Sequence, residues 1–213
     1  MKVLLVHGLG RTPCSMFGLG SALRRAGHRT LYFGYSPTLE TLPGILTRLT
    51  KKLQALARTG EPVGLAAHSL GGLLLRMARL EVPELVVHHL AMLGVPNRPP
   101  RIAAYVWKWR FFRWFSRGCG RFLASADAIP AIPPPADPYT LIAGTAGPRN
   151  PRFLFRGELN DGVVAASETR IRDADRPLLF PVLHSFIMDD RAVQRAVLAT
   201  MMTPSGTLDR NIH

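Results

Sequence analysis

The sequence predicts an α/β protein with one mainly parallel sheet, because short apolar runs alternate with helical patterns along the chain. We expect about six strands. Each expected strand is apolar almost throughout instead of alternating apolar and polar residues. Such strands are typical of a sheet that is covered by helices on both faces, which favours parallel over antiparallel pairing.

The expected elements follow from composition and periodicity. Strands are predicted at 3–7, 30–34, 62–67, 86–93, 139–143 and 178–183. Helices are predicted at 16–26, 39–57, 70–80 and 189–202. In the last of these helices we expect Asp189 and Asp190 in the first turn, where the helix dipole favours acidic side chains.

The alternation stops between Pro96 and Pro138. Two proline-rich segments flank an aromatic stretch at 105–115, in which Trp and Phe are interleaved with Lys and Arg. We interpret residues 97–137, approximately, as a cap or lid insertion within a single domain that spans 1–213. The aromatic stretch fits either a packed or pocket-lining helix or a segment resting on a membrane surface. Residues 203–213 are expected to form a tail.

Ser69 is the candidate nucleophile. It lies where the third strand is expected to end and the third helix to begin, in the segment Ala-His-Ser-Leu-Gly-Gly. A serine presented on a sharp strand-to-helix turn needs small residues two positions before and after it, and Ala67 and Gly71 satisfy this. Taken alone, the segment also fits an ordinary helix start with Ser69 near the cap.

The segment His-Gly-Leu-Gly at 7–10 follows the first expected strand. When a carbonyl is attacked it becomes an oxyanion, which two backbone N–H groups can stabilise. We expect the amides of Leu9 and Leu70 to form this oxyanion hole, and the side chain of His7 to hold the loop by hydrogen bonds. A dinucleotide-binding loop is disfavoured, because Pro13 occupies the position of its third glycine.

The serine needs a base, and the base needs a carboxylate that fixes its tautomer. Doubly wound enzymes with this chemistry carry the three groups in the order Ser, Asp or Glu, His. Asp161, in a turn after the fifth strand, and His184, after the sixth, fit that order. The other histidines lie beside the serine, in or before strands, or at the end of the chain. Three rival acids remain: Asp127, Asp137 and Glu158.

The chain resembles the small bacterial lipases and esterases of the α/β-hydrolase superfamily, of the triacylglycerol lipase type, over nearly its whole length. The resemblance rests on the motifs at 3–10, 66–72, 93–97, 160–164 and 183–185. It implies a minimal α/β-hydrolase fold that opens at the third strand of the full fold. It also implies a Ser69, His184 and Asp161 triad that cleaves carboxylic esters through an acyl-enzyme. Ala67 departs mildly from the usual glycine.

Other functions stay open. The same groups can act on thioesters, amides or lactones, or transfer the acyl group to an alcohol. A member of the fold without catalytic activity could instead bind lipid or a protein through the aromatic segment. A small ester or lipid is the expected substrate. No cofactor is expected, and no metal, because no cluster of His, Cys and Asp has ligand spacing.

The formal net charge is +13, from 27 basic and 14 acidic residues. The arginines are scattered and form no dense basic tail, so we expect no nucleic-acid partner. An anionic membrane surface is a candidate partner through residues 105–117. The chain shows no secretion signal and no apolar run of about 20 residues, which predicts a cytoplasmic protein, either free or peripheral to a membrane. Cys14 and Cys119 are expected as buried or half-buried thiols.

Overall fold

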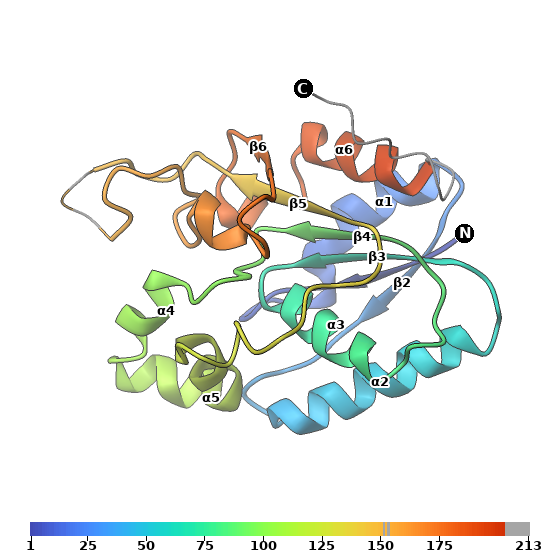
Figure 1. Ribbon diagram of the computed structural model, residues 1–213, viewed down its shortest axis with the longest axis horizontal. Coiled ribbons are helices and arrows are strands. Elements are labelled where there is room, and N and C mark those ends of the chain that lie inside the picture. Colours follow the sequence, from blue (N-terminus) through green and yellow to red (C-terminus); the bar gives the residue numbers. More distant parts are fainter. Residues whose placement is uncertain (151, 153, 203–213) are drawn as a thin grey trace.

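The computed structural model describes residues 1–150, 152 and 154–202. Its centre is a six-stranded sheet in the order β2-β1-β3-β4-β5-β6, and every neighbouring pair of strands is parallel. Figure 1 shows this sheet passing through the middle of the molecule with helices on both sides. The predicted fold class is therefore confirmed.

The strands lie close to their expected positions. They are β1 Lys2–Val6, β2 Arg29–Phe33, β3 Val63–His68, β4 Val87–Leu93, β5 Tyr139–Gly144 and β6 Leu178–Phe180. Only β6 is clearly shorter than expected. Pro181 follows it and has no N–H to donate to a ladder, so the chain leaves the sheet edge there.

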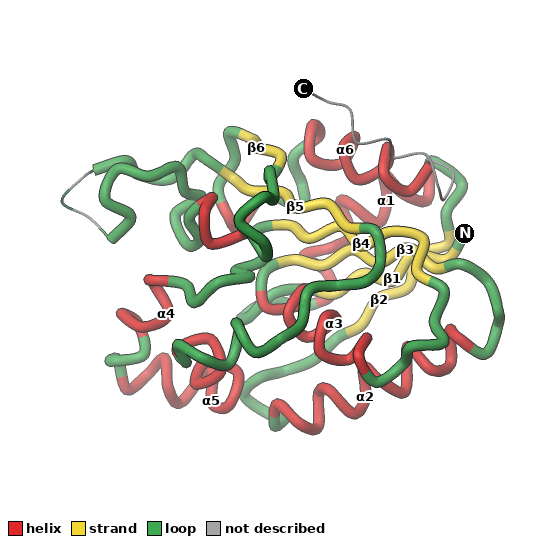
Figure 2. Tube along the Cα trace, in the orientation of Figure 1, coloured by secondary structure: helices red, strands yellow, loops and turns green. Residues whose placement is uncertain are grey.

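Two layers of helices cover the sheet, as Figure 2 shows. The helices α1 (Phe17–Arg25) and α6 (Arg191–Met202) pack on one face, against a cluster that includes Val3 and Leu5 of β1. The helices α2 (Leu42–Ala57) and α3 (Leu70–Leu80) pack on the other face, against Leu4 and Val6. Successive residues of β1 thus point to opposite faces and both are buried, which explains the continuous apolar run.

Side-chain caps decide where two helices begin. Thr41 accepts a hydrogen bond from the amide of Gly44, so α2 begins at Leu42 and not at residue 39. The Asp190 carboxylate accepts hydrogen bonds from the amides of Ala192 and Val193 at 2.8 and 2.9 Å. Asp189 and Asp190 therefore precede α6, and their predicted position in its first turn was wrong.

The insertion after β4 contains two helices, α4 (Arg101–Val106) and α5 (Arg110–Ala124). Arg117 interrupts α5 with a positive φ of 42° and a ψ of −128°. Figure 1 shows α4 and α5 next to each other, on the side of the molecule toward which the strands point. They therefore lie on the same side as the loops that follow β1 and β3.

Three smaller findings complete the fold. No helix within the described residues is long and apolar enough to cross a membrane. Both cysteines are free thiols. Cys119 is buried, but Cys14 is exposed, contrary to expectation. The predicted tail at 203–213 lies outside the described residues.

Candidate active site

The sheet order places two loops together. The chain runs from β1 outward to β2, returns to β3 on the other side of β1, and continues outward to β4. Ligand sites in open parallel sheets lie at the carboxyl ends of the strands where the order reverses in this way. The loops that leave the sheet at this point are residues 7–10, after β1, and Ser69, after β3.

Ser69 has a strained backbone. Its φ is 52° and its ψ is −128°, a combination that residues other than glycine rarely adopt. The turn is held on both sides: the Ser69 amide donates to the carbonyl of Leu93 at 2.9 Å, and its carbonyl accepts from the amide of Gly72 at 3.0 Å. This is the sharp strand-to-helix turn that the sequence predicts at Ser69.

Gly71 allows α3 to start close to β1. A Cβ at this position would meet the carbonyl oxygen of His7 and lie 2.7 Å from that of Val6. Both obstacles are backbone atoms of the first strand and its loop, so they cannot rotate away. The requirement for glycine at this position therefore comes from the approach of the helix to the neighbouring strand.

His184 and Asp161 form a buried pair. The imidazole Nδ1 donates to Asp161 Oδ2 at 2.7 Å, and the two residues are 7% and 2% exposed. Because Nδ1 carries the proton that the carboxylate accepts, Nε2 is the ring nitrogen with a lone pair. His184 lies in a short 3-10 helix (His184–Phe186) after β6.

The carboxylate of Asp161 is itself held in place. Its second oxygen, Oδ1, accepts hydrogen bonds from the amides of Val163 and Val164 at 2.9 and 2.6 Å. The rival acids are engaged elsewhere or exposed to solvent. Asp137 pairs with Arg79, Glu158 pairs with Arg101, and Asp127 is exposed.

Two residues without a predicted role support this pair. His68 Nε2 donates to the backbone carbonyl of His184 at 3.0 Å, and the two rings are 4.6 Å apart. Burial, followed by repulsion from the protonated form of His184, lowers the pKa of His68, which keeps His68 neutral. Gly94 lies against the pair, since a Cβ there would be 3.0 Å from His184 Nδ1 and 3.2 Å from Asp161 Oδ2.

The two amides of the expected oxyanion hole lie at the same end of the sheet. Leu70 is the first residue of α3, and the first N–H groups of a helix have no acceptor within it. Leu9 lies in the loop after β1. Gly8 in this loop faces the serine, because a Cβ on Gly8 would be 3.0 Å from that of Ser69.

His7 holds this loop, as expected. Its Nδ1 donates to the carbonyl of Gly8 at 2.9 Å, and its Nε2 accepts from the amide of Tyr35 at 3.2 Å. The Tyr35 hydroxyl donates to the carbonyl of His7, and the two rings stack at 4.3 Å. Burial lowers the pKa of His7, which favours the neutral ring that can both donate and accept.

A cavity of about 270 Å³ connects these groups to the insertion. Leu9, Ser69 and His184 all line it. The insertion contributes an apolar wall made of Ile102, Ala103, Val106, Phe112 and Leu123. Val163 and Val164, beside Asp161, complete the apolar lining. The cavity thus joins a polar end at the serine to an apolar region beneath the insertion.

Comparison with known proteins identifies the fold. No family model matches the chain, and no curated protein gives a significant match. A mature lipase from Bacillus licheniformis superposes with a TM-score of 0.74 at 15% identity, over 93% of this chain and 90% of that one. The chain has the α/β-hydrolase fold.

Two further structures of this fold align over similar lengths. A Xanthomonas campestris protein of the alpha/beta hydrolase superfamily has a TM-score of 0.62 at 17% identity, over 94% of this chain and 97% of that one. A structure described with the metagenome-derived lipolytic enzymes LipS and LipT has a TM-score of 0.63 at 13% identity, over 95% of this chain and 94% of that one.

In this α/β-hydrolase fold, one buried arginine joins both ends of the insertion to α3. Arg76 is 4% exposed. Its guanidinium donates to Asn97 Oδ1 at 2.8 Å and to the carbonyls of Ile132 and Pro133 at 2.8 and 3.1 Å. All these acceptors are neutral, and burial lowers the pKa of Arg76 to about 10.

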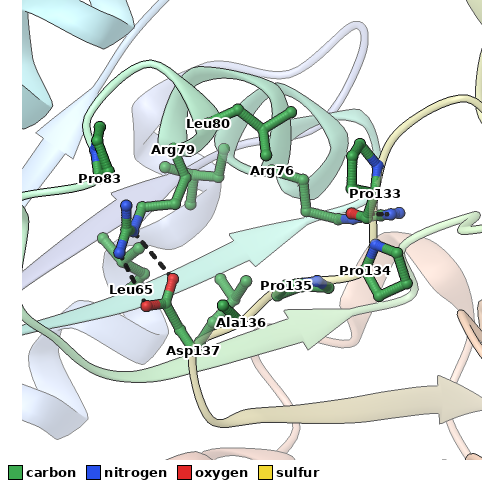
Figure 3. A pocket seen from close by; sticks show the side chains of 12 residues that line it. Leu65, Arg76, Arg79, Leu80, Pro83, Pro133, Pro134, Pro135, Ala136 and Asp137 are labelled. Carbon is green, nitrogen blue, oxygen red and sulfur yellow. Dashed lines mark hydrogen bonds and ion pairs between the residues drawn. The ribbon is translucent and has the colours of Figure 1, made fainter.

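Figure 3 shows this arginine beside a second cavity, of about 280 Å³. Arg76 extends toward Pro133, whereas Arg79, one turn along α3, pairs with Asp137 where the chain enters β5. The second cavity is lined largely by leucine and proline side chains. Arg76 therefore anchors the cap to α3, a role that composition and periodicity did not indicate.

Proposed function

We propose that this chain is a serine hydrolase that cleaves carboxylic esters. The observation that carries the proposal is the buried His184–Asp161 pair, whose histidine lines one cavity together with a strained serine on a strand-to-helix turn. A strained non-glycine residue at the carboxyl end of a parallel strand is typical of a nucleophile that must project above the sheet. The lipase and lipolytic enzymes among the similar structures support the same chemistry.

The proposed reaction has two halves. His184 Nε2 accepts the Ser69 hydroxyl proton as Oγ bonds to the ester carbonyl carbon, and the N–H groups of Leu9 and Leu70 stabilise the oxyanion. The carbon–oxygen bond to the alcohol then breaks, and His184 gives its proton to the departing oxygen. In the second half, water attacks the acyl-enzyme by the same steps and releases the carboxylic acid. Asp161 stabilises the imidazolium in both halves.

The shape and lining of the cavity favour an ester with an apolar acyl group. Its far wall is made of aliphatic and aromatic side chains of the insertion, and such a wall binds methylene groups by excluding water. A volume of about 270 Å³ is slightly below the range of about 300–1,000 Å³ that is typical of ligand sites. We therefore expect short to medium acyl chains to fit beneath the cap as it stands.

Hydrolysis of p-nitrophenyl esters from acetate to palmitate tests the proposal. We expect Ser69→Ala and His184→Ala to lower kcat by up to about 10⁶-fold. Ser185→Ala is the matched control, because Ser185 lines the same cavity but follows the base in the chain. It should keep most of the activity. A fluorophosphonate probe should label the wild type and Ser185→Ala but not Ser69→Ala.

The same two assays separate the alternatives. Labelling of Ser69 without hydrolysis of any ester would contradict the substrate class and favour a thioester, amide or lactone substrate, or acyl transfer. No labelling at all would contradict catalysis by Ser69 and favour a lipid-binding or protein-binding role. Equal loss in Ser69→Ala and Ser185→Ala would contradict the assignment of the nucleophile.

A further inference from the structure

The outer face of the cap carries large aromatic side chains in contact with solvent. Tyr105 of α4, Trp109, and Phe111 and Trp114 of α5 are 53%, 59%, 74% and 60% exposed. The Phe111 and Trp114 rings lie 6.0 Å apart on the same face of the helix. Single exposed apolar residues are ordinary on a protein surface, but this aromatic cluster, which consists of two close ring pairs within residues 105–114, indicates an interaction site.

The same segment of the chain is strongly basic. Residues 101–124 contain no Asp or Glu. Five exposed cations lie on this stretch: Lys108, Arg110, Arg113, Arg117 and Arg121. None of them forms an ion pair with any residue that the structure describes.

The arginines also converge. A shallow hollow of about 610 Å³ on the cap surface is lined by all four arginines of α5, Arg110, Arg113, Arg117 and Arg121, together with Trp107 and Trp114. Arginine binds phosphate oxygens through paired N–H groups, and indole rings are enriched at the boundary between lipid headgroups and acyl chains. The hollow therefore offers both kinds of contact that a phospholipid surface presents.

The two sides of the cap differ in a way that suits an interface. Val106, Phe112 and Leu123 face the cavity that contains Ser69, whereas the aromatic cluster and the arginines face outward. The outer aromatics consequently contribute little to the core of the protein. Their exposure is explained if another apolar phase covers them.

We propose that the outer face of α4 and α5 docks on an anionic phospholipid bilayer. The aromatic side chains enter the headgroup boundary and the arginines bind lipid phosphates. Each basic side chain near such a surface adds about 1 kcal/mol, or about a five-fold increase in affinity. The docking does not depend on the proposed hydrolase activity. If both hold, it brings the wall of the Ser69 cavity next to lipid.

Vesicle binding tests this inference without any chemistry. The Ser69→Ala variant is sedimented with two kinds of vesicle. One contains phosphatidylcholine alone, and the other contains phosphatidylcholine with about 30% phosphatidylglycerol, which gives a strongly negative surface. We expect binding to the anionic vesicles that weakens as salt is raised, and much weaker binding to the neutral ones.

Matched variants locate the surface. Arg110→Gln, Arg113→Gln and Arg121→Gln combined should lower the affinity by about 100-fold. Arg25→Gln, Arg191→Gln and Arg195→Gln combined remove the same charge from a hollow between α1 and α6 that has no aromatic lining, and should leave most of the binding. Trp114→Ala should also weaken binding. Thermal unfolding of each variant verifies that it remains folded.

Three outcomes of the vesicle experiment would overturn the inference. They are absence of binding to anionic vesicles, equal losses in the two triple variants, and equal binding to neutral vesicles. Tighter binding of a single-stranded RNA through the same three arginines would also overturn it, in favour of a nucleic-acid surface. Hydrolysis of a water-soluble ester by the cap variants is measured separately, so that failure of docking is distinguishable from failure of the proposed activity.

Discussion

Asp161 holds His184 at two points. Its carboxylate accepts from the ring Nδ1 at 2.7 Å, and its backbone carbonyl accepts from the His184 amide at 2.9 Å. The first contact sets the tautomer of the ring, and the second positions the segment that carries it. A substitution of the carboxylate alone can therefore change the chemistry of the histidine without releasing its backbone.

Asp161→Asn should lower kcat by about 10⁴-fold with little change in thermal stability. The amide oxygen can still accept from Val163 and Val164, which leaves an N–H group facing Nδ1 and favours the wrong tautomer of His184. Ester hydrolysis and thermal unfolding check this. Glu158→Gln, which breaks an ion pair with Arg101, is the control and should keep its rate. Similar rate losses in both variants would contradict the assignment of the acid.

Gly71→Ala should lower the free energy of unfolding by about 1–3 kcal/mol and reduce activity, because the new methyl group would collide with the backbone of β1. Gly118→Ala is the control, since the nearest atom would lie at 3.6 Å, an ordinary contact. It should be neutral or slightly stabilising, because alanine restricts the unfolded chain. Urea denaturation measures both. Equal stability of the two variants would show that α3 is not tightly held against β1.

Phe112→Ala should shift the preference among water-soluble esters toward longer acyl chains, because this side chain forms part of the apolar wall of the cavity. The adjacent substitution Phe111→Ala is a close control, since that ring is 74% exposed and lies on the outer face. It should leave the chain-length profile unchanged. The measurement is the profile of kcat/KM across the ester series for both variants. A shift in this profile caused by Phe111→Ala and not by Phe112→Ala would contradict this placement of the cavity.

Arg76→Met should lower the free energy of unfolding by about 3 kcal/mol, because it leaves the buried amide oxygen of Asn97, the buried carbonyl of Ile132 and the partly buried carbonyl of Pro133 without their donor. It should also speed proteolytic cleavage within 97–133, since both ends of the insertion lose their anchor. Arg79→Met is the control on the same helix, because it breaks the pair with Asp137 but contacts neither Asn97 nor Ile132. Equal cleavage rates in the two variants would refute the anchoring role.

Stability should decline between pH 6.5 and about 4 because of buried histidines. Burial, with a smaller contribution from the charge of His88, lowers the pKa of His89 from 6.5 to about 4. Between these values the unfolded chain binds a proton that the folded chain does not, so falling pH favours unfolding. His7 and His68, whose pKa values are also lowered, act in the same direction.

His89→Gln should make this decline shallower. Glutamine does not titrate, and its amide can still contact the Thr140 hydroxyl that His89 Nε2 contacts at 2.9 Å. Urea denaturation at pH 7, 6, 5 and 4, approximate steps across the titration range of histidine, measures the slope. An unchanged slope would mean that His89 does not contribute to the acid sensitivity.

Local pattern determined most of the secondary structure. The predicted helix at 70–80 has the same bounds as α3, because its apolar periodicity and the turn before it are both encoded within a few residues. Errors arose where a single local contact moved a boundary. Thr41 and Asp190 cap their helices later than the apolar pattern begins, and Pro181 ends β6 early.

The sequence also indicated the candidate site by order and residue type. Ser69, Asp161 and His184 follow the expected order along the chain, but the sequence left Asp127, Asp137 and Glu158 as rivals for the acid. Only the folded chain separates them, because Asp137 and Glu158 each pair with an arginine and Asp127 is exposed, while Asp161 contacts His184.

Tertiary structure alone decided what supports and covers the site. His68 contacts the backbone of His184 across 116 positions of the chain, and Arg76 contacts Ile132 across 56. No periodic pattern in the sequence indicates such contacts, because the two partners meet only when the parallel strands bring distant segments to one end of the sheet. The sequence also left open whether the aromatic side chains of the cap are buried or exposed. A pattern of alternating aromatic and basic residues fits both a packed helix and an exposed one. Only the fold determines which side of the helix is covered.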